Sequence, residues 1–160
     1  MIAFMKKEDL LKKLIQKVTE NLESLTQSAL DAKAAATDEE AKPENKYDTR
    51  ALESSYLAEA QSVRVGELKR ALHGLQNFQM KNFESIQKIE VGALIEVDVE
   101  DLGTRRWFFL PFAGGEKVEN VFVVTPEAPL GKKLLGLSVG DVFDHNLQGQ
   151  MRECEITKVL

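Results

Sequence analysis

The feature that most constrains the fold is a long apolar seam near the start of the chain. Apolar residues recur at alternating intervals of four and three, at Leu11, Ile15, Val18, Leu22, Leu25, Ala29, Ala32 and Ala36. This heptad spacing places them on one face of an α-helix and is typical of helices that pack against another helix. The seam fades after Ala36, and Lys42-Pro43 disfavours any continuation of the helix.

A second helix is predicted to begin between Glu44 and Thr49 and to end near Phe78. Its apolar residues form two stripes that differ in register, Leu52, Tyr56, Ala60 and Val63 before Gly66, and Leu68, Leu72, Leu75 and Phe78 after it. The sequence therefore predicts an antiparallel hairpin with a local irregularity at Gly66. Arms of about 30 residues would be about 45 Å long. A hairpin this thin needs to dock onto another unit at its base.

After Lys81 the apolar period changes to that of β-strands. Strands are predicted over residues 89–99 (with a bend at Gly92), 105–112, 118–124, 142–147 and 151–160, with hairpin turns at 101–103, 113–116 and 148–150. A short helix is predicted from Pro129 to Leu135, with Leu130, Leu134 and Leu135 on its buried face. The predicted fold class is α+β, a helical hairpin over residues 1–80 followed by a small antiparallel sheet domain over residues 81–160.

Side-chain alternation makes a further prediction about the aromatic run in the second strand. Trp107 and Phe109 should lie on one face of the sheet and Phe108 on the other. At least part of this aromatic set should therefore be core. An aromatic binding surface on the sheet is the less favoured interpretation.

Composition excludes several classes of protein. The net charge of −5 argues against a general nucleic-acid binder, which normally carries a basic surface. Cys154 is the only cysteine, so neither an internal disulfide nor a cysteine-based metal site is expected. The apolar start is too short for a signal peptide, and no run approaches the ~20 apolar residues of a membrane span. We expect a cytoplasmic protein with no membrane contact.

The segment around the predicted short helix resembles a known family. Residues 124–142 read Val-Thr-Pro-Glu-Ala-Pro-Leu-Gly-Lys-Lys-Leu-Leu-Gly-Leu-Ser-Val-Gly-Asp-Val. They resemble the C-terminal signature of the Gre family of bacterial transcription elongation factors, roughly Ser-Pro-Ile/Leu-Gly/Ala-x-Ala-Leu-Leu-Gly-x-x-x-Gly-Asp. Ala128 stands in place of the usual serine and Leu134 in place of the usual alanine. The two-part layout, a hairpin before a small sheet domain, is also similar to that of the family.

The hairpin tip carries the second resemblance. Five carboxylates fall close together in this segment, on Asp38, Glu39, Glu40, Glu44 and Asp48. Family members have Asp-x-x-Glu-Asn at this turn, followed shortly by a tyrosine. Glu44-Asn45 matches the Glu-Asn pair, Tyr47 resembles the tyrosine, and Ala41 stands at the aspartate position with Glu40 beside it.

The resemblance implies a function that depends on RNA polymerase. A Gre-like factor inserts its hairpin into the secondary channel of bacterial RNA polymerase, where tip carboxylates share a Mg²⁺ with the polymerase and backtracked RNA is cleaved. Glu44 and then Glu40 are the implied metal-binding and catalytic carboxylates, with Asp48 as a third. Such a factor completes the polymerase active site and is not a free-standing enzyme. It binds no cofactor alone, and it meets the nascent RNA only indirectly.

Partner contacts are expected at both ends of the molecule. Asn45, Tyr47 and Arg50 are candidates at the tip, and Pro129, Lys132 and Lys133 are candidates for contact with the polymerase rim. The sheet domain also resembles the FKBP-type prolyl isomerases in layout, which says nothing about activity. The hairpin satisfies its own seam, so we expect a monomer.

Several alternatives stay open from the residues alone. Taken alone, the tip acids favour a solvated loop between two helices, and Arg50 favours a local ion pair. A factor that occupies the channel without stimulating cleavage fits the same sequence. So does a coiled-coil adaptor with a partner other than polymerase, whereas a free-standing prolyl isomerase is weakly supported.

Overall fold

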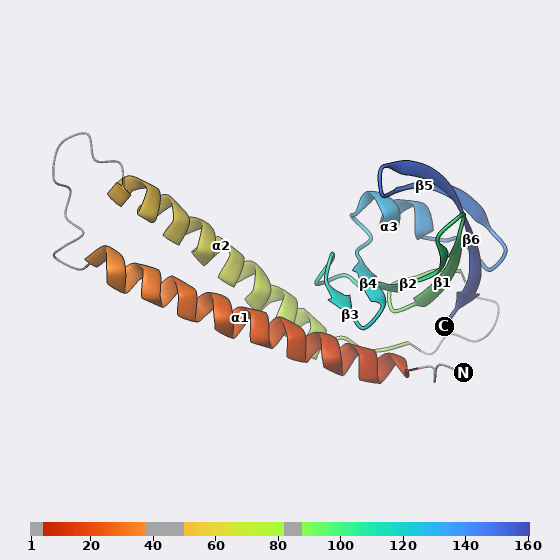
Figure 1. Cartoon of the computed structure of the whole chain (residues 1–160). Helices are drawn as coiled ribbons and strands as arrows, with labels where there is room; N and C mark the ends of the chain where they lie inside the picture. The colour runs from red at the N-terminus through yellow and green to blue at the C-terminus, as the bar shows by residue number, and fades with distance from the viewer. Residues whose placement is uncertain (1–4, 38–49, 82–87) are drawn as a thin grey trace.

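Two long helices make up the N-terminal half of the described chain. The computed structural model describes residues 5–37, 50–81 and 88–160, with α1 spanning Lys7–Thr37 and α2 spanning Arg50–Gln76. Glu8 and Asp9 lie in the first turn of α1, where acidic side chains stabilise the helix dipole. The helices pack as an antiparallel hairpin that projects from the sheet domain (Figure 1). The predicted hairpin is confirmed.

The base of α1 buries more than the predicted seam. Leu11 and Val18 of the seam are buried, but Leu10 and Leu14 are buried as well. All four belong to one apolar cluster that also contains residues of the sheet, including Phe108. The base of α1 therefore packs against α2 on one side and against the sheet domain on another, and this docking meets the need for support that a thin hairpin has.

The face of α2 that packs in the hairpin differs from the prediction. The partly or fully buried positions follow a single heptad register through Ala58, Gln61, Val65, Leu68, Leu72 and Leu75. This register passes Gly66 without a break, so the predicted irregularity is wrong. The predicted stripe of Leu52, Tyr56, Ala60 and Val63 is exposed, and its three large side chains are 54–63% accessible. At 100° per residue this stripe lies on the outer face of α2, away from α1.

Six strands form one mixed sheet. The order across the sheet is β3-β4-β2-β1-β6-β5. The strands are β1 (Leu94–Val99), β2 (Gly103–Phe109), β3 (Lys117–Val118), β4 (Val121–Val124), β5 (Val142–Leu147) and β6 (Gln150–Val159). The short helix α3 spans Pro129–Leu134. The expected α+β fold class is confirmed, while the boundary between residues 80 and 81 stays a prediction.

One strand pairing differs from the expected antiparallel sheet. β2 and β4 are parallel, with Phe108 opposite Val123. The predicted hairpin turn at 113–116 therefore does not join these strands directly. The chain instead crosses over through β3, and Glu119 and Asn120 connect β3 to β4 in an antiparallel pair. Residues 89–91 are not a strand, because Ile89 forms backbone hydrogen bonds with Gly136 and Leu137 instead.

Two apolar layers cover opposite faces of the sheet. Phe108 lies in the cluster that includes the hairpin base, whereas Trp107 and Phe109 lie in a second cluster with Leu134 of α3. The predicted alternation of the aromatic run is thus confirmed, and all three rings are buried rather than offered to a ligand. The sheet is sandwiched between the hairpin base and α3 (Figure 1).

Lysines of α1 add polar contacts between the hairpin and the sheet domain. Lys17 donates to the carbonyl oxygen of Lys117 at 2.6 Å and pairs with Glu116 at 3.4 Å. Lys13, one turn earlier, pairs with Glu119. The Lys13–Glu119 pair is exposed and the Lys17–Glu116 pair is partly buried, so these contacts contribute little free energy beside the apolar cluster.

Candidate functional site

The expected site at the hairpin tip lies outside the described residues. The candidate carboxylates and their neighbours between the two helices are Glu40, Glu44, Asn45, Tyr47 and Asp48. Arg50 is placed only as the first residue of α2. The C-terminal end of α1 and the N-terminal end of α2 lie at the end of the hairpin that is remote from the sheet domain (Figure 1). The roles proposed for the tip residues stay predictions.

The described part of the chain offers no metal centre of its own. Within residues 5–37, 50–81 and 88–160 no group of three or more His, Cys, Asp or Glu side chains is placed to hold a metal ion. Burial raises the pKa of the Cys154 thiol, which favours the unreactive protonated form. None of the helices in these ranges has both the length and the apolarity to span a membrane.

The second candidate site, around α3, is fully described. Pro129 occupies the start of α3, and Lys132 and Lys133 lie in its last turn, where cations favour the helix dipole. All three side chains are exposed. Ala128 at the N-cap makes no side-chain hydrogen bond, so the first turn of α3 lacks the cap that a serine, threonine, aspartate or asparagine would supply.

Three glycines in and after α3 occupy positions where a side chain would be unfavourable. A Cβ on Gly131 would lie 1.9 Å from the carbonyl oxygen of Thr125, so α3 approaches the preceding loop as closely as a backbone allows. Gly136 and Gly140 have φ angles of 84° and 92°, a region that favours glycine. The Asp141 carboxylate accepts a hydrogen bond from the Ser138 amide at 2.7 Å, which closes the turn into β5. The glycines and Asp141 of this segment therefore have structural roles in this chain.

Lys133 links α3 to the edge of the sheet. Its ammonium donates to the Asp144 carbonyl oxygen at 2.6 Å. Burial lowers the pKa of the nearby His145, and the Lys133 charge lowers it further, so the neutral imidazole is favoured. α3 thus brings together Pro129, Lys132 and Lys133, the candidates for contact with the polymerase rim. Lys133 already has a hydrogen-bond partner within the chain.

The sequence reasoning missed the apolar residues that surround this site. Leu135, Val139 and Val142 are 53–54% exposed. The prediction that places Leu135 on the buried face of the short helix is therefore wrong. At 100° per residue Leu135 points well away from Leu134, which is fully buried. This angular offset is the signal that distinguishes the two leucines.

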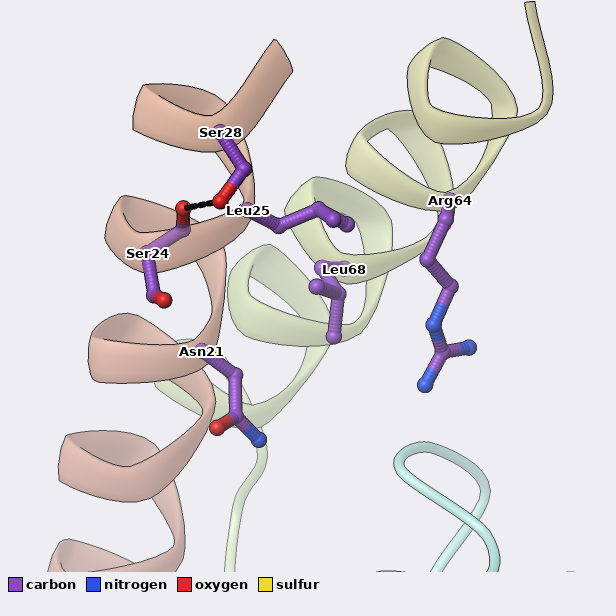
Figure 2. Close-up of a pocket in the computed structure, with 6 residues that line it drawn as sticks. All are labelled: Asn21, Ser24, Leu25, Ser28, Arg64 and Leu68. Atoms are coloured by element: carbon purple, nitrogen blue, oxygen red, sulfur yellow. Dashed lines mark hydrogen bonds between the residues drawn. The ribbon is translucent and has the colours of Figure 1, made fainter. Parts of the chain in front are cut away.

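A shallow groove of about 340 Å³ runs between α1 and α2 halfway along the hairpin (Figure 2). Its lining residues are Asn21, Ser24, Leu25, Ser28, Arg64 and Leu68. Ser28 donates to the Ser24 carbonyl oxygen at 3.0 Å, and Arg64 pairs with Glu67 at 3.1 Å. With these groups engaged within their own helices, the groove brings together no set of groups suited to catalysis.

Comparisons with known proteins find similarity at the level of structure. No protein-family model matches the chain, and no curated protein matches it in sequence. The solved structures similar to it include GreA factor homolog 1 (Gfh1) of Thermus thermophilus, with 18% identity, a TM-score of 0.42, and 91% of this chain and 94% of that chain covered. For Thermus aquaticus Gfh1 the values are 17%, 0.41, 90% and 92%. For a GreA/GreB elongation factor of Nitrosomonas europaea they are 15%, 0.38, 57% and 78%.

Proposed function

We propose that this protein is a Gre-like factor that binds bacterial RNA polymerase by inserting its hairpin into the secondary channel. The observation that carries the proposal is the pairing of a long hairpin, docked at its base, with the Gre-like segment that forms α3 and the turn into β5. Because the base of the hairpin is packed on the sheet domain, the remainder of the hairpin projects away from that domain and could enter a channel. The proposed site of action is therefore the end of the hairpin that bears the acidic tip segment.

At the tip, the carboxylates of Glu44, Glu40 and Asp48 are the proposed contribution of this chain to chemistry. Carboxylate oxygens suit Mg²⁺, which is commonly held by one or two carboxylates together with water and phosphate. In the complex the metal would activate water for hydrolysis of backtracked RNA. Asn45, Tyr47 and Arg50 would position the tip against polymerase and its RNA. Pro129, Lys132 and Lys133 would contact the channel rim.

Cleavage of RNA in backtracked elongation complexes tests this proposal. The wild-type chain should raise the cleavage rate, and Glu44→Ala should abolish the increase while binding to polymerase is retained. Glu59→Ala is the matched control, because it removes an exposed carboxylate from the same arm outside the tip. A wild-type chain that displaces a known channel binder without stimulating cleavage would be a channel occupant that modulates the enzyme. A chain that does neither contradicts the proposal.

A second candidate function is that of a coiled-coil adaptor with a partner other than polymerase. The observation that favours it is the outer face of α2, where Leu52, Tyr56 and Val63 are more than half exposed. An apolar helical face of this kind suits packing against a partner helix. Co-purification with polymerase distinguishes the two functions, because an adaptor of this kind would not be retained by the enzyme.

A further inference from the structure

The sheet ends at an edge formed by β5, which among the described strands pairs with β6 alone (Figure 1). The two strands are joined by Gln148 and Gly149, and Leu147 lies opposite Gln150. In a two-residue hairpin the flanking pair exchanges ladder hydrogen bonds, and every second pair after it does the same. The backbone groups of Val142, Asp144 and Asn146 therefore point away from β6, toward the open edge.

A side-chain contact supports this assignment independently. The Asp144 carbonyl oxygen accepts its hydrogen bond from Lys133 of α3, which does not belong to the sheet. The edge thus already binds one cationic donor supplied by the chain itself. Among the described residues, no backbone–backbone hydrogen bond reaches the edge groups of Val142, Asp144 or Asn146 from outside the strands.

The side chains next to this edge are strongly acidic on one face. Asp144 lies directly opposite Glu153, and Glu155 lies between Val142 of β5 and Asp98 of β1. Directly opposite residues share a face of the sheet. Asp144 and Glu153 are therefore one pair of like charges, and Glu155 and Asp98 are a second. The cations on this face, Arg106 and Lys158, pair with Glu96 further along the sheet. Beside the edge, the carboxylates of Asp144, Glu153 and Glu155 outnumber the ammonium of Lys133.

A second copy of the chain fits this edge poorly. Two antiparallel edges must align residues that both point outward, which here means Val142, Asp144 and Asn146. The register that pairs the whole strand places Asp144 opposite Asp144 of the other copy. It also brings the acidic faces of both copies together, and opposed like charges destabilise such a pairing.

We propose that the edge of β5 binds an extended cationic peptide segment as an added strand. Backbone pairing to Val142 and Asn146 and to the N–H of Asp144 supplies the hydrogen bonds, as in other strand-addition complexes, while the Asp144 carbonyl oxygen exchanges its bond from Lys133 for one from a peptide N–H. Lysine or arginine side chains at alternate positions of the peptide lie beside Asp144 of β5, and their length lets them extend toward Glu153 and Glu155 of β6, one strand further in. Apolar residues between them point to the opposite face of the sheet, the face that carries Phe143 and Leu147 of β5. This activity is separate from the proposed role of the hairpin.

The test uses the full chain and an acetylated, amidated peptide of alternating Lys and Val as the probe. Binding is measured by titration calorimetry, and amide hydrogen exchange by NMR locates the contact. We expect the amides of Val142, Asp144 and Asn146 to become protected. A peptide that is N-methylated at alternate residues keeps its charge but loses edge donors, so it should bind at least about tenfold more weakly. A Glu-Val peptide should not bind.

Variants of the protein test the same contacts that the modified peptides test. Asn146→Pro removes an outward N–H without removing a ladder bond, so it should weaken binding while the sheet remains folded. The double variant Glu153→Gln, Glu155→Gln should weaken binding mainly at low salt. Equal affinity for the N-methylated peptide, protection away from β5, or no binding of the Lys-Val peptide would each overturn the proposal. Because the N-methylated peptide is tested on the wild-type chain, the test stands even if Asn146→Pro fails to fold.

Discussion

At the residue scale, Gly131 and Gly74 each mark a place where two segments meet too closely for a side chain. A Cβ on Gly131 would meet the backbone of Thr125, whereas a Cβ on Gly74 would lie 2.5 Å from the ring of Phe112. Backbone cannot move aside without displacing the whole loop, but a ring can turn if its surroundings allow it. The two glycines should therefore respond differently to substitution.

Gly131→Ala should destabilise the protein by about 3 kcal/mol, because α3 must move off the loop that holds Thr125. Chemical denaturation followed by Trp107 fluorescence measures the loss, since Trp107 lies in the same apolar cluster as α3. Lys132→Ala is the matched control on the same helix and should change stability by less than about 0.5 kcal/mol. Equal stability of Gly131→Ala and wild type would show that the close approach is unimportant.

Gly74→Ala should destabilise the wild type but stabilise a Phe112→Ala background. In the wild type the new methyl group displaces the Phe112 ring from the cluster at the hairpin base. Without the ring, only the better helix propensity of alanine remains, worth up to about 1 kcal/mol. A double-mutant cycle by urea denaturation measures the coupling. The same sign of effect in both backgrounds would argue against a steric origin.

At the element scale, α2 shows why a hairpin needs one register along its whole length. The heptad that contains Leu68, Leu72 and Leu75 continues toward the tip through Val65, Gln61 and Ala58. Those positions face α1 although Leu52, Tyr56 and Val63 are more apolar. A straight helix cannot turn a second face toward its partner, so the better-packed base imposes its register on the remainder.

Alanine substitutions on α2 distinguish its two faces. Leu75→Ala should cost about 2–5 kcal/mol, because Leu75 is buried in the cluster at the hairpin base. Leu52→Ala should cost less than about 0.5 kcal/mol, because its side chain lies on the outer face. Thermal unfolding followed by circular dichroism at 222 nm compares the two variants. A comparable loss of stability in both variants would indicate that Leu52 is also buried against α1.

Gln61 is a polar residue within the same seam, and its side-chain oxygen has no hydrogen-bond partner among the described residues. Gln61→Leu should raise the free energy of unfolding by about 1 kcal/mol, because an unsatisfied acceptor is replaced by apolar surface. Urea denaturation measures the change, with Gln61→Glu as the opposite control that should lower stability. A less stable Gln61→Leu variant would indicate that Gln61 is satisfied by water.

At the scale of the whole molecule, one apolar cluster joins the hairpin to the sheet. It contains Leu14 and Val18 of α1, Leu68 and Leu75 of α2, and Phe108 of β2. Because this cluster is shared, neither unit keeps its full core without the other. The lysine ion pairs of α1 are exposed or only partly buried and add comparatively little.

Cooperative unfolding should follow from this shared cluster. Helix content, read at 222 nm, reports mainly the hairpin, and fluorescence of the buried Trp107 reports the sheet domain. The two denaturation curves of the wild type should coincide, as in a two-state transition. Curves with separate midpoints would instead favour two independently folding units divided near residue 80.

The candidate site was predictable in part. The helix at Pro129 and the turn glycines follow from local signals, because Pro suits a helix start and positive φ suits glycine. Contacts such as Lys133 with Asp144 could not be predicted, since they depend on how α3 lies against β5. The acidic tip residues lie outside the described residues, so their roles stay predictions.

By itself, the sequence determined the elements whose signals are local. The heptad of α1, the alternation that separates Phe108 from Trp107 and Phe109, and the turns at glycines all depend on residues close together in the chain. Only the tertiary structure decided which face of α2 is buried and that β2 and β4 pair in parallel. Those choices depend on contacts between distant segments, where the packing of a shared cluster outweighs local apolarity.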